Sequence, residues 1–289
     1  MSSRVLTVSD QEEVELACDS IEPFDTLLVT EHAGDTDRQR LLDELKAIKD
    51  IRDGTSFCKA KHVYELIWNK RVHSRTLHQT LRNIPGIKYH NITTSRVMKG
   101  LVPDNKYGEE LRKKMVDYTI TIQDPLVSED QITCWLASSA RKLYRTINPS
   151  DYSPLCHDPI VISIETKTPD GSREKALVQL SIWVMAHFNR LRALATDPVS
   201  ITLPLLFVSG EHWQLMFIRD IESSIVSCHQ LPAILILMLI SQEIFDCVTI
   251  GNTESILGCY KILTALRHLY NWAATIFQPW FVNNVLTPE

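Results

Sequence analysis

An acid and a lysine stand two residues apart at the polar end of one short apolar segment. The segment PIVISIETK spans residues 159–167 and ends with Glu165 and Lys167 near its polar end. Residues two apart on a β-strand point to the same face, so these two side chains are expected to emerge side by side. The pattern predicts a buried strand that holds an acid and a lysine together.

A second acid comes from an earlier segment. MVDYTITI at residues 115–122 alternates, and Asp117 lies on the polar face of the expected strand. Hydrolysis of a phosphodiester needs a hard divalent cation, acids that hold it and a group that positions water. If the two strands are neighbours, Asp117 and Glu165 hold the cation, and Lys167 orients the water and shares the developing charge. A surface ion pair beside a solvated aspartate is the plainer alternative.

Two helices are expected before these strands. Residues 35–54 repeat leucine and isoleucine at helical spacing, and Gly54 is expected to end that helix. Residues 58–86 predict a longer helix that ends near a Pro-Gly pair. One face of this second helix gathers four residues: Glu65, Asn69, Val72 and His73.

The remaining segments alternate between strand and helix patterns. Strands are expected at 86–97, 115–122, 159–167, 200–210 and 212–218. Helices are expected at 128–145, at 174–194 and, late in the chain, at about 231–245 and 253–276. After the expected strand at 159–167, the helix at 174–194 therefore precedes the strands at 200–210 and 212–218.

Composition narrows the class of protein. The length of 289 residues fits one α/β core with peripheral additions. Seven scattered cysteines without a CxxC pair predict reduced thiols and argue against a zinc site or disulfide scaffold. The longest apolar run, 231–240, is too short to span a membrane, and the N-terminus lacks a signal pattern. We therefore expect an intracellular protein of the cytoplasm or nucleus, with no membrane partner.

Charge is distributed unevenly along the chain. The net charge is −5, yet residues 59–114 hold 13 basic and 4 acidic residues. A basic block in an acidic protein fits contacts with a phosphate backbone, or only the solvated face of a helix and loop. Both interpretations stay open on charge alone.

Six blocks taken together resemble the fungal PD-(D/E)XK nuclease-like family, which is restriction-endonuclease-like. The blocks are ELIWNKRVH (65–73), KMVDYTI (114–120), PIVISIETK (159–167), ALVQLSIWVMAHFNRL (176–191), LPLLFVSGEHW (203–213) and IGNTESILGCYKI (250–262). The resemblance implies an α/β fold with a mixed central sheet flanked by helices and with C-terminal helices. It covers roughly residues 60–285 and implies a nuclease-like domain at 59–289 after an acidic N-terminal helical extension at 1–58.

The resemblance also implies roles for particular residues. Asp117 matches the metal-binding acid of the second strand, and Glu165 and Lys167 match the ExK element. Glu65 matches an acid on the first helix and is implied as an additional metal or water ligand. Gln179 matches a polar residue that packs beside the site from the following helix.

Other family positions have no assigned role. Trp68 and Trp183 are expected to pack in the core, and His73 is expected to form hydrogen bonds. His157 and Asp158 are expected to cap a loop rather than to touch the site. Glu211 and His212 are expected to face apart, because adjacent residues on a strand point in opposite directions.

The chain departs from the family pattern at two points. Val116 stands where a proline would precede the acid. The long separation between Asp117 and Glu165 implies an insertion at 124–158 that could reshape access to the site.

Three functions remain open. A nuclease using Mg²⁺ or Mn²⁺ predicts metal between Asp117 and Glu165, with nucleic acid in a groove lined by Lys70, Arg71, Lys113 and Lys114. A small-molecule reaction in fungal specialised metabolism, needing no metal, predicts an enclosed apolar pocket of a few hundred Å³ beside the site or under the 124–158 insertion. A catalytically silent binding protein is the third hypothesis. The sequence leaves the substrate, the nucleic-acid type and the oligomeric state open.

Overall fold

Six β-strands form one mixed sheet whose spatial order follows the chain from β1 to β6. The strands are Ile87–Asn91, Tyr118–Ile122, Ile160–Lys167, Thr202–Ser209, His212–Asp220 and Gln242–Asn252. β3 and β4 run parallel, and the other neighbouring pairs are antiparallel. A parallel pair requires a crossover connection, which the helix α7 (Arg173–Leu194) supplies. The computed structural model describes residues 35–82, 84–102, 116–123, 127, 129–137, 145–220 and 242–286.

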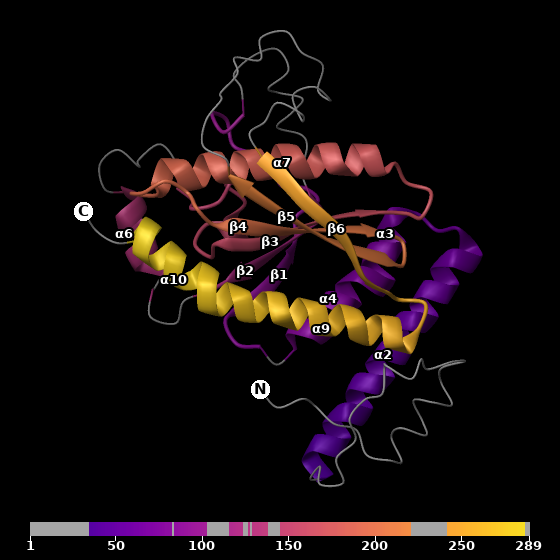
Figure 1. Cartoon of the computed structure of the whole chain (residues 1–289). Helices are drawn as coiled ribbons and strands as arrows, with labels where there is room; N and C mark the ends of the chain where they lie inside the picture. Colours follow the sequence, from indigo (N-terminus) through magenta and orange to yellow (C-terminus); the bar gives the residue numbers. More distant parts are fainter. Residues whose placement is uncertain are drawn as a thin grey trace.

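Helices cover both faces of the sheet. α7 lies along one face, and α4 (Ser74–Leu81) and α9 (Ile256–Trp272) lie along the other (Figure 1). Trp183 of α7 is fully buried, and its Nε1 donates to Ser163 Oγ of β3 at 3.1 Å. Because residues alternate along a strand, Ser163, Glu165 and Lys167 all face α7. This mixed sheet with flanking helices agrees with the predicted fold class.

The first helix is longer than the sequence predicted. α2 spans Asp35–Lys61, so the predicted end at Gly54 is wrong. A Cβ atom at Gly54 would lie 3.0 Å from the carbonyl oxygen of Arg71, so the glycine permits close packing between helices. The backbone turns instead at His62, whose φ is 45°.

α2 shares a hydrophobic cluster with distant segments. Leu45 and Ile48 of α2 pack in this cluster with Trp68 and with Leu263 of α9. The predicted division between an extension at 1–58 and a domain at 59–289 falls inside α2, and it stays a prediction.

The helix predicted at 58–86 is divided into three parts. α3 (Glu65–Trp68) continues into the π-helical turn η2 (Asn69–His73), which continues into α4. Its first residues belong to α2 instead. Such π-helical turns often occur at functional sites, since the extra residue per turn redirects neighbouring side chains. Here the turn buries both Asn69 and His73.

Shorter helical segments lie in the 124–158 insertion and at the C-terminal end of the described chain. The insertion holds α6 (Glu129–Ala137), which lies within the helix predicted at 128–145, and a 3₁₀ turn at Ser153–Leu155. Beyond α9 follow π-helical turns at Ala273–Phe277 and Val282–Leu286, with α10 (Gln278–Phe281) between them.

The late helix predicted at about 231–245 is wrong at its described residues, which form a strand. Residues 242–245 belong to β6, which pairs with β5 from Asp220↔Gln242 to His212↔Asn252. The long antiparallel ladder thus overrides the local apolar pattern. The rest of that segment lies outside the described residues. Within the described part of the chain, no helix combines the length and apolar content needed to cross a membrane.

Candidate functional site

Four of the predicted catalytic side chains meet at the C-terminal end of β3. Lys167 Nζ donates to Glu165 Oε1 at 2.5 Å and lies 3.5 Å from Glu65 Oε2 of α3. Asp117 comes just before β2, where its backbone nitrogen donates to Ile164 O of β3 at 3.0 Å. The antiparallel pairing of β2 with β3 therefore brings the two predicted acids into one region.

The residue between Glu165 and Lys167 fixes the position of Asp117. Thr166 donates to Asp117 Oδ2 from both its backbone nitrogen and its Oγ1, each at 2.8 Å. Thr166 Oγ1 also lies 2.8 Å from the Asn69 side-chain amide. The strand thus presents its acid and lysine on one side, while the threonine between them holds the acid of the neighbouring strand.

A buried histidine continues this network. His73 Nε2 lies 2.8 Å from the carbonyl oxygen of Gly210, which can only accept, so this nitrogen donates. Burial lowers the pKa of His73 to about 4, so its ring is neutral at pH 7 and its Nδ1 accepts. Asn69 Oδ1 lies 2.8 Å from Nδ1. Because an accepting Nδ1 needs a donor, we assign the amide nitrogen to this position, which an exchange of the amide oxygen and nitrogen provides. The prediction that His73 forms hydrogen bonds is confirmed.

Burial raises the pKa of all three carboxylic acids. For Glu165 burial is the main cause, the nearby Asp117 charge adds to it, and the pKa rises to about 8 even though Lys167 opposes the shift. The pKa values of Asp117 and Glu65 also rise, again mainly through burial. Burial alone would lower the pKa of Lys167, but its carboxylate neighbours raise it overall. Among the described residues, the three acids therefore share Lys167 as their cationic partner.

The residues present fit a hard divalent cation. Glu165 is 1% exposed, and among the described residues its Oε2 has no hydrogen-bond partner. A buried carboxylate oxygen without a donor, beside two further acids, leaves negative charge that a cation would compensate. The ligand atoms of Glu65, Asp117 and Glu165 are not gathered as tightly as those of a second acidic group.

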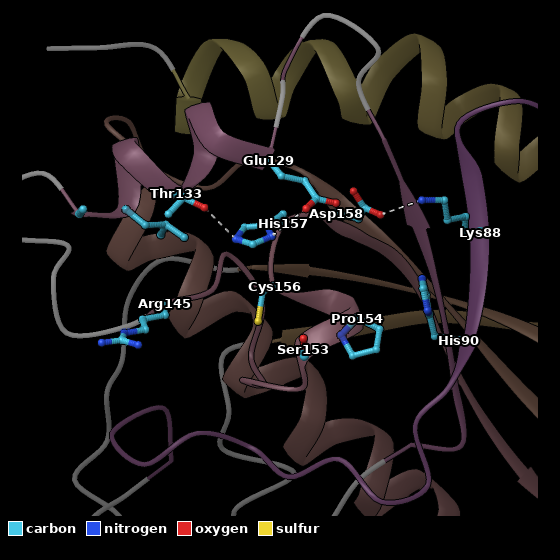
Figure 2. Close-up of a pocket in the computed structure, with 12 residues that line it drawn as sticks. Lys88, His90, Glu129, Thr133, Arg145, Ser153, Pro154, Cys156, His157 and Asp158 are labelled. Carbon is cyan, nitrogen blue, oxygen red and sulfur yellow. Dashed lines mark hydrogen bonds and ion pairs between the residues drawn. The ribbon is translucent and has the colours of Figure 1, made fainter.

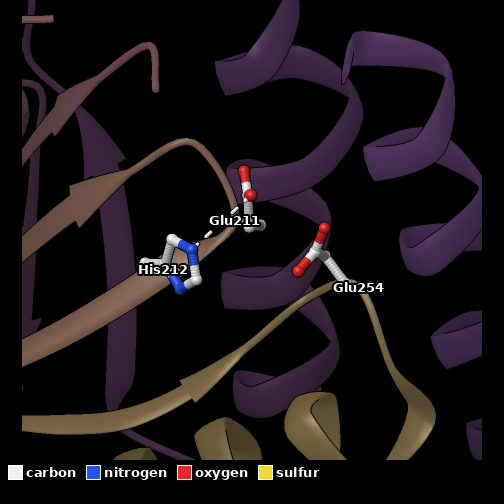
Figure 3. A group of neighbouring side chains, drawn as sticks. All are labelled: Glu211, His212 and Glu254. Atoms are coloured by element: carbon white, nitrogen blue, oxygen red, sulfur yellow. Dashed lines mark ion pairs between the residues drawn. The ribbon is translucent and has the colours of Figure 1, made fainter. Parts of the chain in front are cut away.

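That second group contains Glu211, His212 and Glu254, whose ligand atoms lie within 4.8 Å of one another (Figure 3). The expectation that Glu211 and His212 face apart is wrong: His212 Nε2 lies 3.5 Å from Glu211 Oε1. Glu211 belongs to the turn between β4 and β5, where strand alternation does not apply. The Lys59 ammonium donates to Glu211 at 2.7 Å and also to Glu254, so a cation of the chain itself already serves these acids.

The remaining predicted residues are partly exposed and partly buried. Lys70 and Arg71 are exposed, and the Arg71 guanidinium lies 4.1 Å from the centre of the Phe57 ring. Lys113 and Lys114 lie outside the described residues. Trp68 and Trp183 are buried, which confirms their predicted packing role.

Gln179 is half-buried on α7. Trp183 of α7 donates to Ser163 of β3. Gln179 lies four residues before this tryptophan on the helix, and Glu165 lies two residues after this serine on the strand. β3 leads directly into α7, so the helix runs back along the strand. One helical turn and two strand residues have similar lengths, so this spacing predicts that Gln179 lies over Glu165. Its role in the site stays a prediction.

A sequence model of the PD-(D/E)XK nuclease superfamily matches residues 15–278. The chain belongs to the PD-(D/E)XK nuclease superfamily. No match was found among curated proteins or among solved structures. Together with the six-stranded mixed sheet, the match identifies a restriction-endonuclease-like α/β core. Proteins of this superfamily commonly use divalent metals, and the narrower resemblance to fungal members stays an expectation.

Within this superfamily fold, a large pocket lies against the 124–158 insertion. Its volume is about 920 Å³, and it reaches from Lys88 and His90 of β1 to Arg145 (Figure 2). Lys88 Nζ lies 3.5 Å from Asp158 Oδ2, and His157 Nε2 lies 3.1 Å from Thr133 Oγ1. The lining mixes charged, polar and apolar side chains, in contrast to the apolar pocket expected under the small-molecule hypothesis.

The pocket and the acidic site lie at opposite ends of β3. Asp158 comes just before β3 begins, whereas Glu165 lies near its end, and the strand rise separates them by roughly 20 Å. α6 and α3 likewise lie at opposite ends of the sheet (Figure 1). His157 and Asp158 therefore do not reach the acids, as expected, because their partners lie at the pocket.

The raised pKa of Glu165 predicts how stability depends on pH in the metal-free protein. The folded state keeps a proton that the unfolded state loses near pH 4.5, so this contribution to stability is lost as pH rises toward about 8. Glu165→Gln has no such proton. We expect the unfolding free energy of Glu165→Gln, measured relative to that of the native protein, to rise by about 1 kcal/mol per pH unit between the pKa values of the unfolded and folded states.

Chemical denaturation in EDTA across this pH range measures the difference. The control is Glu254→Gln, which changes a carboxylate whose side chain is 43% exposed. A difference between Glu165→Gln and the native protein that stays constant with pH would contradict the assignment.

Proposed function

We propose that this chain is a metal-dependent phosphodiester hydrolase. Asp117 and Glu165 hold Mg²⁺ or Mn²⁺, Glu65 adds a metal or water ligand, and Lys167 positions the attacking water. The observation that carries the proposal is the buried Glu165 carboxylate, which has one oxygen without a partner among the described residues and a pKa raised to about 8. When bound, the metal supplies charge neutralisation at the phosphate and a more acidic water.

Lys167 acts as a cation in this proposal. Its Nζ donates to Glu165 Oε1 and to Thr166 O, at 2.5 and 2.8 Å, which fixes two of its three protons. The third is available on the side of Glu65, 3.5 Å away. Since its raised pKa keeps Lys167 protonated, it orients water and stabilises developing charge, and it does not remove a proton.

Glu65 is the acid best placed to exchange protons with solvent. Its side chain is 37% exposed, compared with 1% for Glu165. Burial raises its pKa, which makes the carboxylate a better proton acceptor. Gln179 would contact the site from α7. The exposed cations Lys70 and Arg71, with Lys113 and Lys114, would contact phosphates.

The test is cleavage of single- and double-stranded DNA and RNA with Mg²⁺ or Mn²⁺. We expect Glu165→Gln and Lys167→Ala to lose at least about 100-fold in rate, because each removes charge at the reacting phosphate. Glu254→Gln, from the acidic group served by Lys59, is the matched control and is expected to cleave like the native protein.

Circular dichroism establishes that the variants fold. The proposal is abandoned if the native protein neither cleaves any of the four substrates nor binds metal. A catalytically silent binding protein would give that result.

The large pocket favours a second candidate function, a small-molecule reaction in fungal specialised metabolism. Its volume of about 920 Å³ lies within the range of roughly 300–1,000 Å³ that ligand pockets span, and the pocket lies under the 124–158 insertion. Arg145 lines the pocket and makes no ion pair with any described residue, so it can receive an anionic group. The polar lining fits a charged metabolite better than an apolar one.

Ala137 gives a way to separate the two candidates. It lines the pocket from the end of α6 and is exposed, so Ala137→Trp fills the pocket without disturbing the core. If the nuclease proposal holds, we expect this variant to retain full metal-dependent cleavage, measured with the substrates above. Loss of cleavage in a folded Ala137→Trp protein would instead make the pocket part of the active site.

A further inference from the structure

Two exposed apolar side chains flank an acid of the candidate site. Tyr64 is 86% exposed and Leu66 is 73% exposed, the highest values among the large apolar residues that the structure describes. Glu65 lies between them in sequence and belongs to the site through Lys167. Exposed apolar surface that is contiguous and rimmed by polar residues marks contact surfaces.

Folding does not require these side chains. The backbone carbonyl of Tyr64 begins α3 by accepting from Ile67 N at 2.9 Å, a contact that any residue can make. Within the described part of the chain, the Tyr64 hydroxyl makes no hydrogen bond and its ring contacts no other ring. The ring is therefore available to a ligand.

Tyr64 and Leu66 flank Glu65, the most exposed of the charged side chains at the site. Side-chain exposure rises from 1% at Glu165 to 15% at Lys167 and 37% at Glu65. A substrate that reaches the buried acid therefore passes Glu65, and with it the two exposed residues on either side.

Basic side chains lie close to this surface along the chain. Lys70 follows Leu66 by one helical turn, and Arg71 follows next, while Lys61 comes three residues before Tyr64. All three are exposed. Phosphates are attracted by such cations, and an exposed aromatic ring stacks on a nucleobase.

We propose that Tyr64, supported by Leu66, stacks against an unpaired base of single-stranded nucleic acid. The inference rests on the proposed function and specifies its substrate class. In a duplex both faces of each base are covered by neighbouring pairs, so a single projecting ring finds no base to stack on unless the strand is open. The flanking cations favour nucleic acid over an apolar protein surface as the occupant.

Fluorescence anisotropy with labelled oligonucleotides tests the stacking directly. The full chain is titrated in EDTA, which prevents cleavage, onto a single-stranded oligonucleotide, its duplex and an abasic strand with the same phosphates. We expect Tyr64→Ala to weaken single-strand binding roughly tenfold and Tyr64→Phe to leave it unchanged. Binding of the abasic strand is expected to be equally weak in the native protein and in Tyr64→Ala.

The matched control is Ile276→Ala, which removes another exposed apolar side chain, 52% exposed and beyond α9. It is expected to bind every oligonucleotide like the native protein. Unchanged single-strand binding by Tyr64→Ala overturns the inference, as does an equal loss with the abasic strand. If the native protein cleaves but Tyr64→Ala is neutral, only this inference fails; if the native protein neither binds nor cleaves, the proposed function fails with it.

Discussion

The candidate site depends on one arrangement of charge: a buried glutamate that, within the described part of the chain, shares its cationic partner with two other acids. Glu165 lies near the C-terminal end of β3, the strand that pairs in parallel with β4. There it is shielded from water by α7 and by the neighbouring strands, so its charged form is costly. Lys167 offsets part of that cost, and the remainder appears as a pKa raised to about 8. A protein gains little stability from such an arrangement, which is why it points to chemistry.

The rest of the local structure holds this arrangement in place. Thr166 ties Asp117 to β3, and the π-helical turn at Asn69–His73 brings an amide and a neutral imidazole behind that threonine. His73 in turn holds the carbonyl of Gly210, where a Cβ would come within 2.5 Å of the Pro169 ring. The turn after β3 therefore packs against the turn after β4, which His73 holds. Asn69 and His73 act as positioning residues, since neither touches Glu165 directly.

Much of this could be predicted from the sequence. Strand periodicity located Glu165 and Lys167 on one face, and helical spacing put Glu65, Asn69 and His73 on another face that does meet the site. The link from Asn69 through Thr166 to Asp117 was not predicted, because it joins residues from three segments far apart in the chain. Local patterns also failed where packing decides the outcome. Gly54 allows close helix contact instead of ending α2, β6 forms because β5 offers it a long ladder, and Glu211 meets His212 because it lies in a turn.

The location of a bound metal tests the central claim most directly. Anomalous diffraction from crystals soaked in Mn²⁺ measures that location without requiring a substrate or a turnover assay. We predict a manganese peak between the carboxylates of Asp117 and Glu165, absent from Glu165→Gln crystals treated in the same way. Manganese bound only at Glu211, His212 and Glu254, with Lys59 displaced, would contradict the assignment of Glu165 as a metal ligand.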